Sequence, residues 1–144
     1  MMKEEELLFK ELQAAWLNRN GRNFAACFAN DGTLIAFDGT YVKGKSEIYR
    51  YVQELFRVEQ DLLYQSVPVE LKRLTPTIVL FRCHTGKIRR ETNRIRDERM
   101  AHLTLLLQKK AVWEIVLMQY TPASFETYPK MRTSFQYELE ESMD

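Results

Sequence analysis

Residues 21–51 constrain the fold more than any other part of the sequence, because turn signals divide them into short, closely spaced elements. Apolar residues at helical spacing predict a helix over 23–29, and apolar runs predict short strands at 33–37 and 41–42. Two Asp-Gly dipeptides supply the turns between these elements: Asp31-Gly32 and Asp38-Gly39. Helix, turn, strand, turn and strand in so little chain indicate a protein that mixes helices with a sheet.

Two longer amphipathic helices are predicted, one before this central stretch and one that begins within it. Over residues 3–19, apolar side chains recur along one helical face: Leu8, Leu12, Ala15 and Trp16. After Gly44, Ser46 and Glu47 open a second helix with an apolar face of Ile48, Val52, Leu55 and Phe56. Each apolar face requires a partner, and the strands that follow supply one.

Four longer strands are predicted in the rest of the chain, at 62–74, 77–85, 99–108 and 112–121. Pro68 lies inside the first of them and cannot donate a hydrogen bond to a neighbouring strand. It therefore predicts a β-bulge or an edge strand.

The last two strands are predicted to form a hairpin around a two-residue turn at Lys110-Ala111. This register places His102 opposite Gln119. It assigns Thr104, Leu106, Trp113, Ile115 and Leu117 to their face of the sheet, and Leu103, Leu105, Val116 and Met118 to the other face. Both faces are apolar, so we expect helices to cover one and a second subunit to cover the other.

A chain of 144 residues suits one domain that can bury a core without disulfides or metals. Its net charge of +1 provides no general attraction for nucleic acids or acidic membranes, and no apolar run approaches membrane-spanning length. The acidic start, MMKEEELLFK, is not typical of a signal peptide. We expect a cytoplasmic protein without nucleic-acid or membrane partners, in which Cys27 and Cys83 are buried thiols.

The order of these features resembles the nuclear transport factor 2-like superfamily, and within it the SnoaL-like and SgcJ/EcaC-type groups. The resembling features are the helix with Trp16, the segments 28–32 and 44–48, Asp38-Gly39, Trp113-Glu114-Ile115 and Gln119-Tyr120-Thr121. The resemblance implies an α+β, cystatin-like cone: a curved antiparallel sheet, helices on its concave face, an apolar pocket between them, and commonly a homodimer through the outer sheet face. Residues 1–121 would form this domain. Residues 122–144 would form a C-terminal appendage that packs through its aromatic side chains.

The resemblance also implies a function in the pocket. The superfamily holds isomerases, cyclases, dehydratases and epoxide hydrolases, and many members that only bind or assemble. Its enzymes place a carboxylate in the pocket, often with His or Tyr. A buried carboxylate of raised pKa can take a proton from carbon while a polar neighbour stabilises the oxyanion.

Asp38 and His102 are the candidates for such a general base. Asp38 is the carboxylate nearest the end of the first predicted strand, although an Asp before Gly39 is more commonly a turn residue that binds its own backbone. His102 and Gln119 are polar side chains on an apolar face. They require partners there, and a histidine satisfied in the core or at a dimer interface is the alternative interpretation.

Six further residues are candidates to bind a ligand. Four are aromatic side chains that could line a pocket or simply fill the core: Trp16, Phe37, Phe56 and Trp113. Gln119 and Tyr120 could donate hydrogen bonds to the ligand.

No metal or cofactor is predicted. The two His and two Cys lack ligand spacing, and the five glycines form neither a dinucleotide fingerprint nor a P-loop. Residues 87–99 carry an excess of positive charge that is typical of a solvated loop. The alternatives are that they contact an anion, or that they receive the acidic residues 138–144 of their own or a neighbouring subunit.

Our leading interpretation is a homodimeric domain that binds a small apolar or aromatic molecule without established catalysis. The first alternative is a SnoaL-like isomerase, cyclase or dehydratase that uses the pocket Asp or His. The second is a non-catalytic dimerisation or assembly module for a protein partner.

Overall fold

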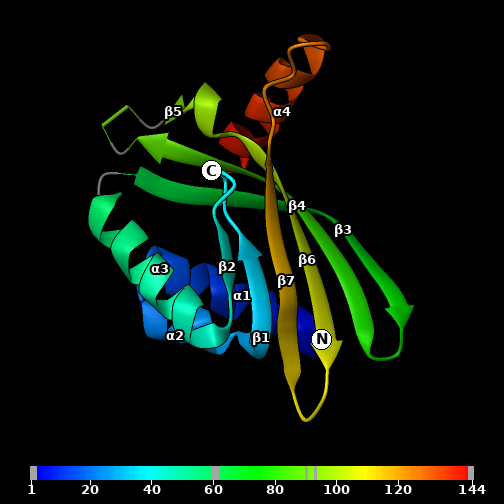
Figure 1. Cartoon of the computed structure of the whole chain (residues 1–144). Helices are drawn as coiled ribbons and strands as arrows, with labels where there is room; N and C mark the ends of the chain where they lie inside the picture. Colours follow the sequence, from blue (N-terminus) through cyan, green and yellow to red (C-terminus); the bar gives the residue numbers. More distant parts are fainter. Residues whose placement is uncertain (1–2, 60–61, 90, 93, 143–144) are drawn as a thin grey trace.

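Three helices pack on one face of a strongly curved sheet in the computed structural model, which describes residues 3–59, 62–89, 91–92 and 94–142 (Figure 1). They are α1 (Glu4–Leu17), α2 (Gly21–Ala26) and α3 (Lys45–Val58). The side chain of Asn20 begins α2 by accepting a hydrogen bond from the backbone N–H of Asn23 at 3.0 Å. Gly44, with φ of 95°, precedes α3 in a conformation that favours glycine.

The described residues form one open sheet of seven strands. The strands are β1 (Phe28–Ile35), β2 (Tyr41–Lys43), β3 (Leu62–Thr75), β4 (Ile78–Arg89), β5 (Arg94–Ile95), β6 (Ala101–Lys109) and β7 (Trp113–Pro122). Six of them follow the order β2-β1-β7-β6-β4-β3, and β5 pairs with β4.

One strand pair differs from the antiparallel sheet that we expected. β1 runs parallel to β7, whereas every other pair is antiparallel, so the sheet is mixed. The two strands lie far apart in the sequence, and the apolar pattern of each carries no information on the direction of a distant neighbour. A Cβ at Gly32 would lie 2.9 Å from the carbonyl oxygen of Ile115, so this close approach of β1 to β7 requires glycine.

The core lies between the helices and the concave sheet face. Ile48, Val52 and Phe56 are buried at a spacing of four residues along α3, as their periodicity predicts. Alternate residues of β6 are buried beneath the helices: Ala101, Leu103, Leu105 and Leu107. Cys27 and Cys83 are also buried and free, which confirms the prediction of buried thiols, and burial raises the pKa of each to about 12.

The prediction made from Pro68 is confirmed. β3 is an edge strand of the described sheet, and its pairing with β4 shifts by one residue between Pro68 and Glu70. Because a bulge exchanges the two faces of a strand, Val67 lies on the outer face, whereas Leu71 pairs with the inward-facing Phe81.

The predicted register of the β6–β7 hairpin is wrong. Lys109 lies opposite Trp113, so the turn has three residues, and a bulge beyond Leu107 adds one more. His102 therefore lies opposite Thr121, and Gln119 lies opposite Thr104, which separates the predicted His102–Gln119 pair. The extra turn residue moves Trp113 and Ile115 to the buried face of the sheet, and the bulge returns Leu117 and Gln119 to the outer face.

The C-terminal segment forms a helix, α4 (Lys130–Glu141), that packs on the outer face at one end of the sheet (Figure 1). Its Phe135 and Leu139 are buried against Ile88, Ile95 and Met100, and a Cβ at Gly86 would meet Leu139 at 3.0 Å. This agrees with the expectation that the segment packs through its aromatic side chains. The boundary after residue 121 stays a prediction.

Acidic side chains of α4 contact the basic stretch of the same chain. Glu140 lies 3.7 Å from Arg94 and accepts a hydrogen bond from the backbone N–H of Ile95 at 3.3 Å. Residues 143 and 144 of the acidic tail lie outside the described residues. None of the helices that the structure describes is long and apolar enough to cross a membrane.

Candidate functional site

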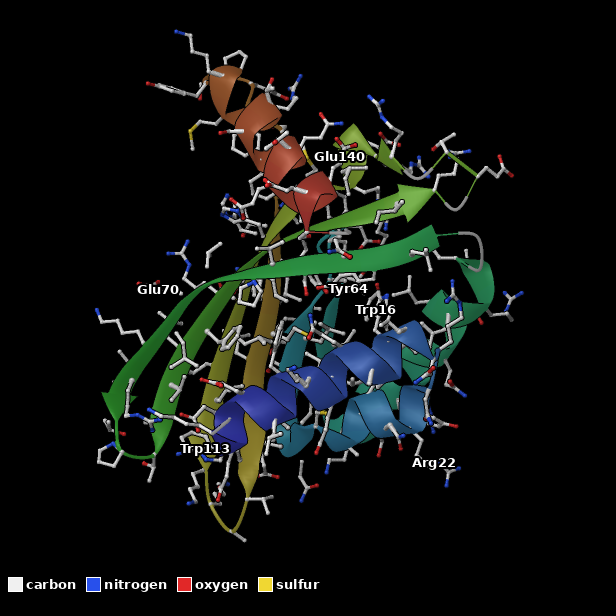
Figure 2. The ribbon with its side chains drawn as sticks, turned by 180° about the vertical axis from the view of Figure 1, so that it is seen from behind. Trp16, Arg22, Tyr64, Glu70, Trp113 and Glu140 are labelled. Atoms are coloured by element: carbon white, nitrogen blue, oxygen red, sulfur yellow. The ribbon has the colours of Figure 1, made fainter. Side chains whose placement is uncertain are left out.

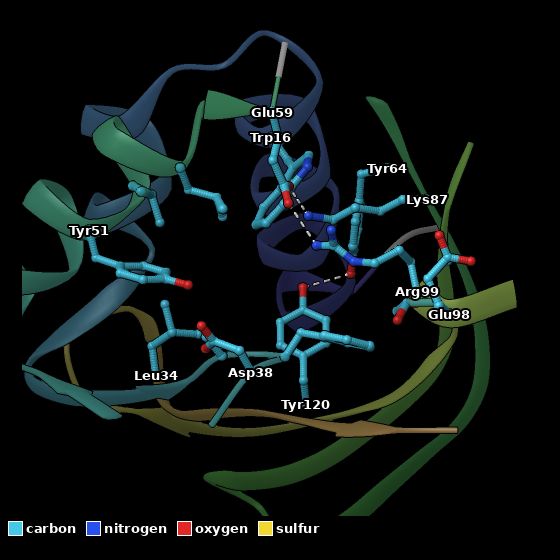
Figure 3. Close-up of a pocket in the computed structure, with 16 residues that line it drawn as sticks. Trp16, Leu34, Asp38, Tyr51, Glu59, Tyr64, Lys87, Glu98, Arg99 and Tyr120 are labelled. Carbon is cyan, nitrogen blue, oxygen red and sulfur yellow. Dashed lines mark hydrogen bonds and ion pairs between the residues drawn. The ribbon is translucent and has the colours of Figure 1, made fainter. Parts of the chain in front are cut away.

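A cavity of about 380 Å³ lies between α1, α3 and the concave sheet, close to the β1–β2 turn (Figure 3). One side of its wall is apolar, and its residues come from α1, α3 and the β1 region: Trp16, Leu34, Ala36, Phe37, Val52 and Leu55. The other side is polar and includes Tyr51, Tyr64, Tyr120, Glu59, Lys87 and Arg99. Concave, largely apolar spaces with a few convergent polar groups are typical of small-molecule sites.

Trp16, near the C-terminal end of α1, is the main aromatic surface of the cavity. Its ring lies 4.6 Å from that of Tyr64 and meets the ring of Phe56 edge-on at 5.4 Å. The ammonium of Lys87 lies 5.5 Å from the indole centroid, within the range of a cation–π contact. Trp16 is therefore held by neighbours on several sides, so its position is defined before any ligand binds.

The polar side of the cavity is organised by Glu59, the residue that follows α3. Its carboxylate accepts hydrogen bonds from Lys87 on β4 and, at 2.7 Å, from Nη2 of Arg99. Arg99 ends the 3₁₀ helix η1 (Asp97–Arg99), so three separate elements meet at this carboxylate (Figure 3). The exposed fractions are 19% for Glu59, 11% for Lys87 and 21% for Arg99, so water screens these charges only in part.

The pKa shifts follow from this arrangement. Burial alone would raise the pKa of Glu59, but the hydrogen bonds and charges of Lys87 and Arg99 outweigh it and lower the pKa below the ordinary value. Burial lowers the pKa of Lys87, although Glu59 opposes the shift. Glu59 is thus firmly ionised at neutral pH.

Two phenols complete the polar side. The hydroxyl of Tyr120, on β7, donates a hydrogen bond to the hydroxyl of Tyr64, on β3, at 3.0 Å. Burial raises the pKa of both groups, and Tyr64 is raised further by the neighbouring Tyr120. Both phenols remain protonated at neutral pH and can act as hydrogen-bond donors.

Four of the predicted site residues line the cavity: Trp16, Phe37, Asp38 and Tyr120. Phe56 is buried behind Trp16 and supports the wall without lining it. Trp113 belongs to the core at the opposite end of the sheet, where it contacts Arg73 (Figure 2). Gln119 lies on the outer sheet face, because its neighbour Tyr120 points into the cavity.

Asp38 reaches the cavity only at its rim. The residue is exposed, and its carboxylate accepts hydrogen bonds from the backbone N–H of Thr40 at 3.0 Å and from the Thr40 hydroxyl at 2.7 Å. These bonds lower the pKa of Asp38. The environment is that of a turn residue, the alternative that the sequence left open, and differs from that of a buried base with a raised pKa.

His102 lies on the outer sheet face, away from the cavity. It faces His84, with ring centroids 5.2 Å apart, and the edge of Phe135 on α4 at 5.4 Å. Burial, His84 and Arg82 lower the pKa of His102. Its surroundings are those of a histidine packed under a helix.

Glu59, Lys87, Arg99 and Tyr64 line the cavity but were not predicted. The sequence held a signal for Lys87: alternate residues of β4 point inward from Val79, and continuing that alternation through Thr85 reaches Lys87. We predicted that the strand ends at Gly86 and that residues 87–99 form a solvated loop, whereas β4 continues to Arg89. Glu59 and Arg99 carried no local signal, because only tertiary structure brings them to Lys87.

The described residues hold no group of three or more His, Cys, Asp or Glu side chains placed to bind a metal ion. The cavity therefore offers hydrogen bonds, one cluster of charges and an aromatic wall. These are the means of binding an organic molecule and of orienting its polar end.

The sequence matches no family model and no curated protein. Among solved structures, the fold is similar to a domain of unknown function with a cystatin-like fold from Nostoc punctiforme. The two share 18% identity, the match covers 99% of this chain and 93% of that chain, and the TM-score is 0.80.

Two other solved structures with related folds carry functional names. A provisionally named calcium/calmodulin-dependent protein kinase type II association domain from Thiobacillus denitrificans has a TM-score of 0.75 at 16% identity, over 85% of this chain and 98% of that one. A provisionally named dehydratase of the NTF2-like family from Streptomyces avermitilis has a TM-score of 0.69 at 9% identity, over 83% and 94%. The structural similarity establishes the fold, which is the nuclear transport factor 2-like, cystatin-like fold, and at these low sequence identities it establishes the fold alone. The SgcJ/EcaC-type subgroup stays a prediction.

Proposed function

We propose that this protein binds a small apolar or aromatic molecule in the cavity between α1, α3 and the concave sheet. The observation that carries the proposal is the cavity itself, in which an aromatic and aliphatic wall faces convergent polar groups at one side. The contacts that Trp16 makes with Tyr64 and Phe56 support it further, because a wall fixed in advance lowers the ordering cost of binding.

Binding is better supported than proton-transfer catalysis. The described carboxylates that line the cavity are Asp38, Glu59 and Glu98, and the pKa of each lies below its ordinary value. A base that removes a proton from carbon works best with a pKa near the operating pH. The similarity to a provisionally named dehydratase is the reason to retain the enzyme as an alternative.

The outer sheet face supports the homodimer that we expected. Leu80, Leu106 and Leu117 lie side by side on three neighbouring strands and are only half-buried in the single chain. α4 covers a different part of this face, around His84 and Ile88. We infer that the leucine row, defined as these three residues, packs against a second copy. The similarity to a provisionally named association domain is consistent with assembly through this fold.

The binding proposal is tested by titrating the protein with Nile red, a neutral dye whose emission shifts to the blue in apolar surroundings. Ala36→Phe places a ring in the cavity and should abolish the shift, whereas Ala14→Phe, on the exposed side of α1, should leave it unchanged. Tryptophan fluorescence provides a second readout. Because the chain has two tryptophans, the titration is repeated with a Trp113→Phe variant, in which any change in tryptophan fluorescence comes from Trp16. Equal dye binding by both alanine variants would contradict the proposal.

A further inference from the structure

The polar side of the cavity carries more positive than negative charge. Lys87 and Arg99 face a single largely buried carboxylate, that of Glu59. The other two acidic residues at the cavity are engaged elsewhere: exposed Asp38 binds Thr40, and Glu98, with an exposed fraction of 60%, binds Arg96. One positive charge in the interior is therefore left without a buried counter-charge among the described residues.

Arg99 also holds an unused hydrogen-bond donor. Its Nε is buried and has no partner within the described part of the chain, while its Nη2 is occupied by Glu59. The guanidinium lies over the ring of Phe37, with the central carbon 5.1 Å from the ring centroid. A buried donor without a partner is destabilising, so a ligand atom that accepts from it recovers that free energy.

The tyrosine pair offers a second donor at the same cavity. The two phenols share one hydrogen bond, from Tyr120 to Tyr64, so the hydroxyl proton of Tyr64 is not used within the pair. Tyr64 comes from β3 and packs against Trp16, which places this donor beside the aromatic wall (Figure 3). An anionic oxygen is the acceptor that satisfies a phenol and a guanidinium best.

We propose that the ligand is an organic acid that carries one carboxylate on an apolar or aromatic body. This inference rests on the proposed function and specifies its ligand class. The carboxylate accepts hydrogen bonds from Nε of Arg99 and from the Tyr64 hydroxyl, and the body lies against Trp16 and Val52. Glu59 is a positioning residue that holds both cations in the cavity wall. The single surplus charge matches a monoanion, whereas a phosphate ester with two charges would lack a second counter-charge.

The test compares two probes that share one body and differ in charge, cinnamate and cinnamyl alcohol, by isothermal titration calorimetry at neutral pH. The wild-type protein should bind cinnamate more tightly by roughly ten- to a hundredfold, the range expected for hydrogen bonds to a charged group. Arg99→Met should remove this preference and leave the affinity for the alcohol unchanged. Arg57→Met is the control, because it removes the same charge from the exposed side of α3, where Arg57 pairs with Glu54, and neither residue lines the cavity.

A second variant guards against a loss of folding in Arg99→Met. Tyr64→Phe removes only the hydroxyl and keeps the ring against Trp16, so it should still fold and should reduce the preference for cinnamate. Its stability should fall somewhat, because the Tyr120 hydroxyl loses its acceptor. If wild-type protein binds the alcohol as tightly as the acid, the inference is overturned and the proposed function stands. If it binds neither probe, nor Nile red, both fail together.

Discussion

Glu59 is the residue on which the polar side of the cavity depends, because it is the carboxylate that pairs with both Lys87 and Arg99 in the described structure. Glu59→Gln should lower the free energy of unfolding by roughly 2–3 kcal/mol, less than for a fully buried pair because water reaches part of the site. Glu54→Gln is the control, since Glu54 pairs with Arg57 on the exposed side of α3 and should matter little. Urea denaturation at neutral pH measures the free energy of unfolding of both variants.

The acid dependence of this difference has a defined sign. The folded-state pKa of Glu59 is lowered, so the stabilisation by its carboxylate is fully present above the unfolded pKa, near 4.5, and is lost as the pH falls through the folded value. Glu59→Gln and the wild type should therefore converge in stability under acid. A constant difference across that window would mean that the charge of Glu59 is not what stabilises the fold.

At the residue scale, the sequence predicts the aromatic part of the cavity better than its charged part. Trp16 and Tyr120 could be found because apolar periodicity and strand alternation carry information on which way a side chain points. Lys87 could have been found by extending the inward–outward alternation of β4 past Thr85. Glu59 and Arg99 could not have been found in this way. Glu59 follows α3 and Arg99 ends η1, and only the tertiary packing brings these two helix ends to the cavity.

At the scale of elements, α4 rests on a histidine-containing patch whose charge state depends on pH. His84 contacts Glu138 at 3.0 Å and stacks on Phe135, while His102 faces His84 and Phe135 and lies near Arg82. The folded-state pKa of His102 lies below the unfolded value of 6.5, so the unfolded chain binds more protons as the pH falls through that range. Acidification should therefore destabilise the protein through His102.

His102→Gln should make the stability less sensitive to acid between about pH 7.5 and about pH 5.5. Urea denaturation at the two pH values measures the change, and Gln108→Ala, on the same face of β6 but away from α4, serves as control. An unchanged pH dependence in His102→Gln would show that the histidine titrates equally in the folded and unfolded chains.

The elements themselves could largely be predicted from sequence, whereas their register could not. Periodicity predicted the helices and the main strands, and Pro68 correctly indicated both a bulge and an edge. The pairing of His102 with Gln119 failed because a turn longer by one residue and one bulge shift every later partner by two positions. Turn length and bulges depend on local backbone geometry that the apolar pattern of the flanking strands does not encode.

At the scale of the whole molecule, the outer sheet face is the feature that a single chain leaves incomplete. Leu80, Leu106 and Leu117 form a half-exposed row beside the region that α4 covers. Leu106→Arg should convert a dimer into a monomer, because a dimer would bury two unpaired charges at the centre of the interface. Val112→Arg, at the exposed hairpin turn, should leave the dimer intact.

Light scattering coupled to size-exclusion chromatography measures the mass of each variant. A wild-type protein that is monomeric at all concentrations would contradict the homodimer. A Leu106→Arg variant that remains a dimer would show that the interface lies on another surface. The sequence suggested two apolar faces on the hairpin. In the structure, the apolar residues of the outer face of the hairpin are fewer than predicted, because Trp113 and Ile115 are buried on the inner face.

The most direct test of the central claim is a crystal structure of the protein purified from its native host, inspected for density in the cavity. The account predicts an organic molecule whose body lies against Trp16 and whose acidic end meets Nε of Arg99 and the Tyr64 hydroxyl. A cavity that holds only water, or that is closed by its own side chains, would contradict it.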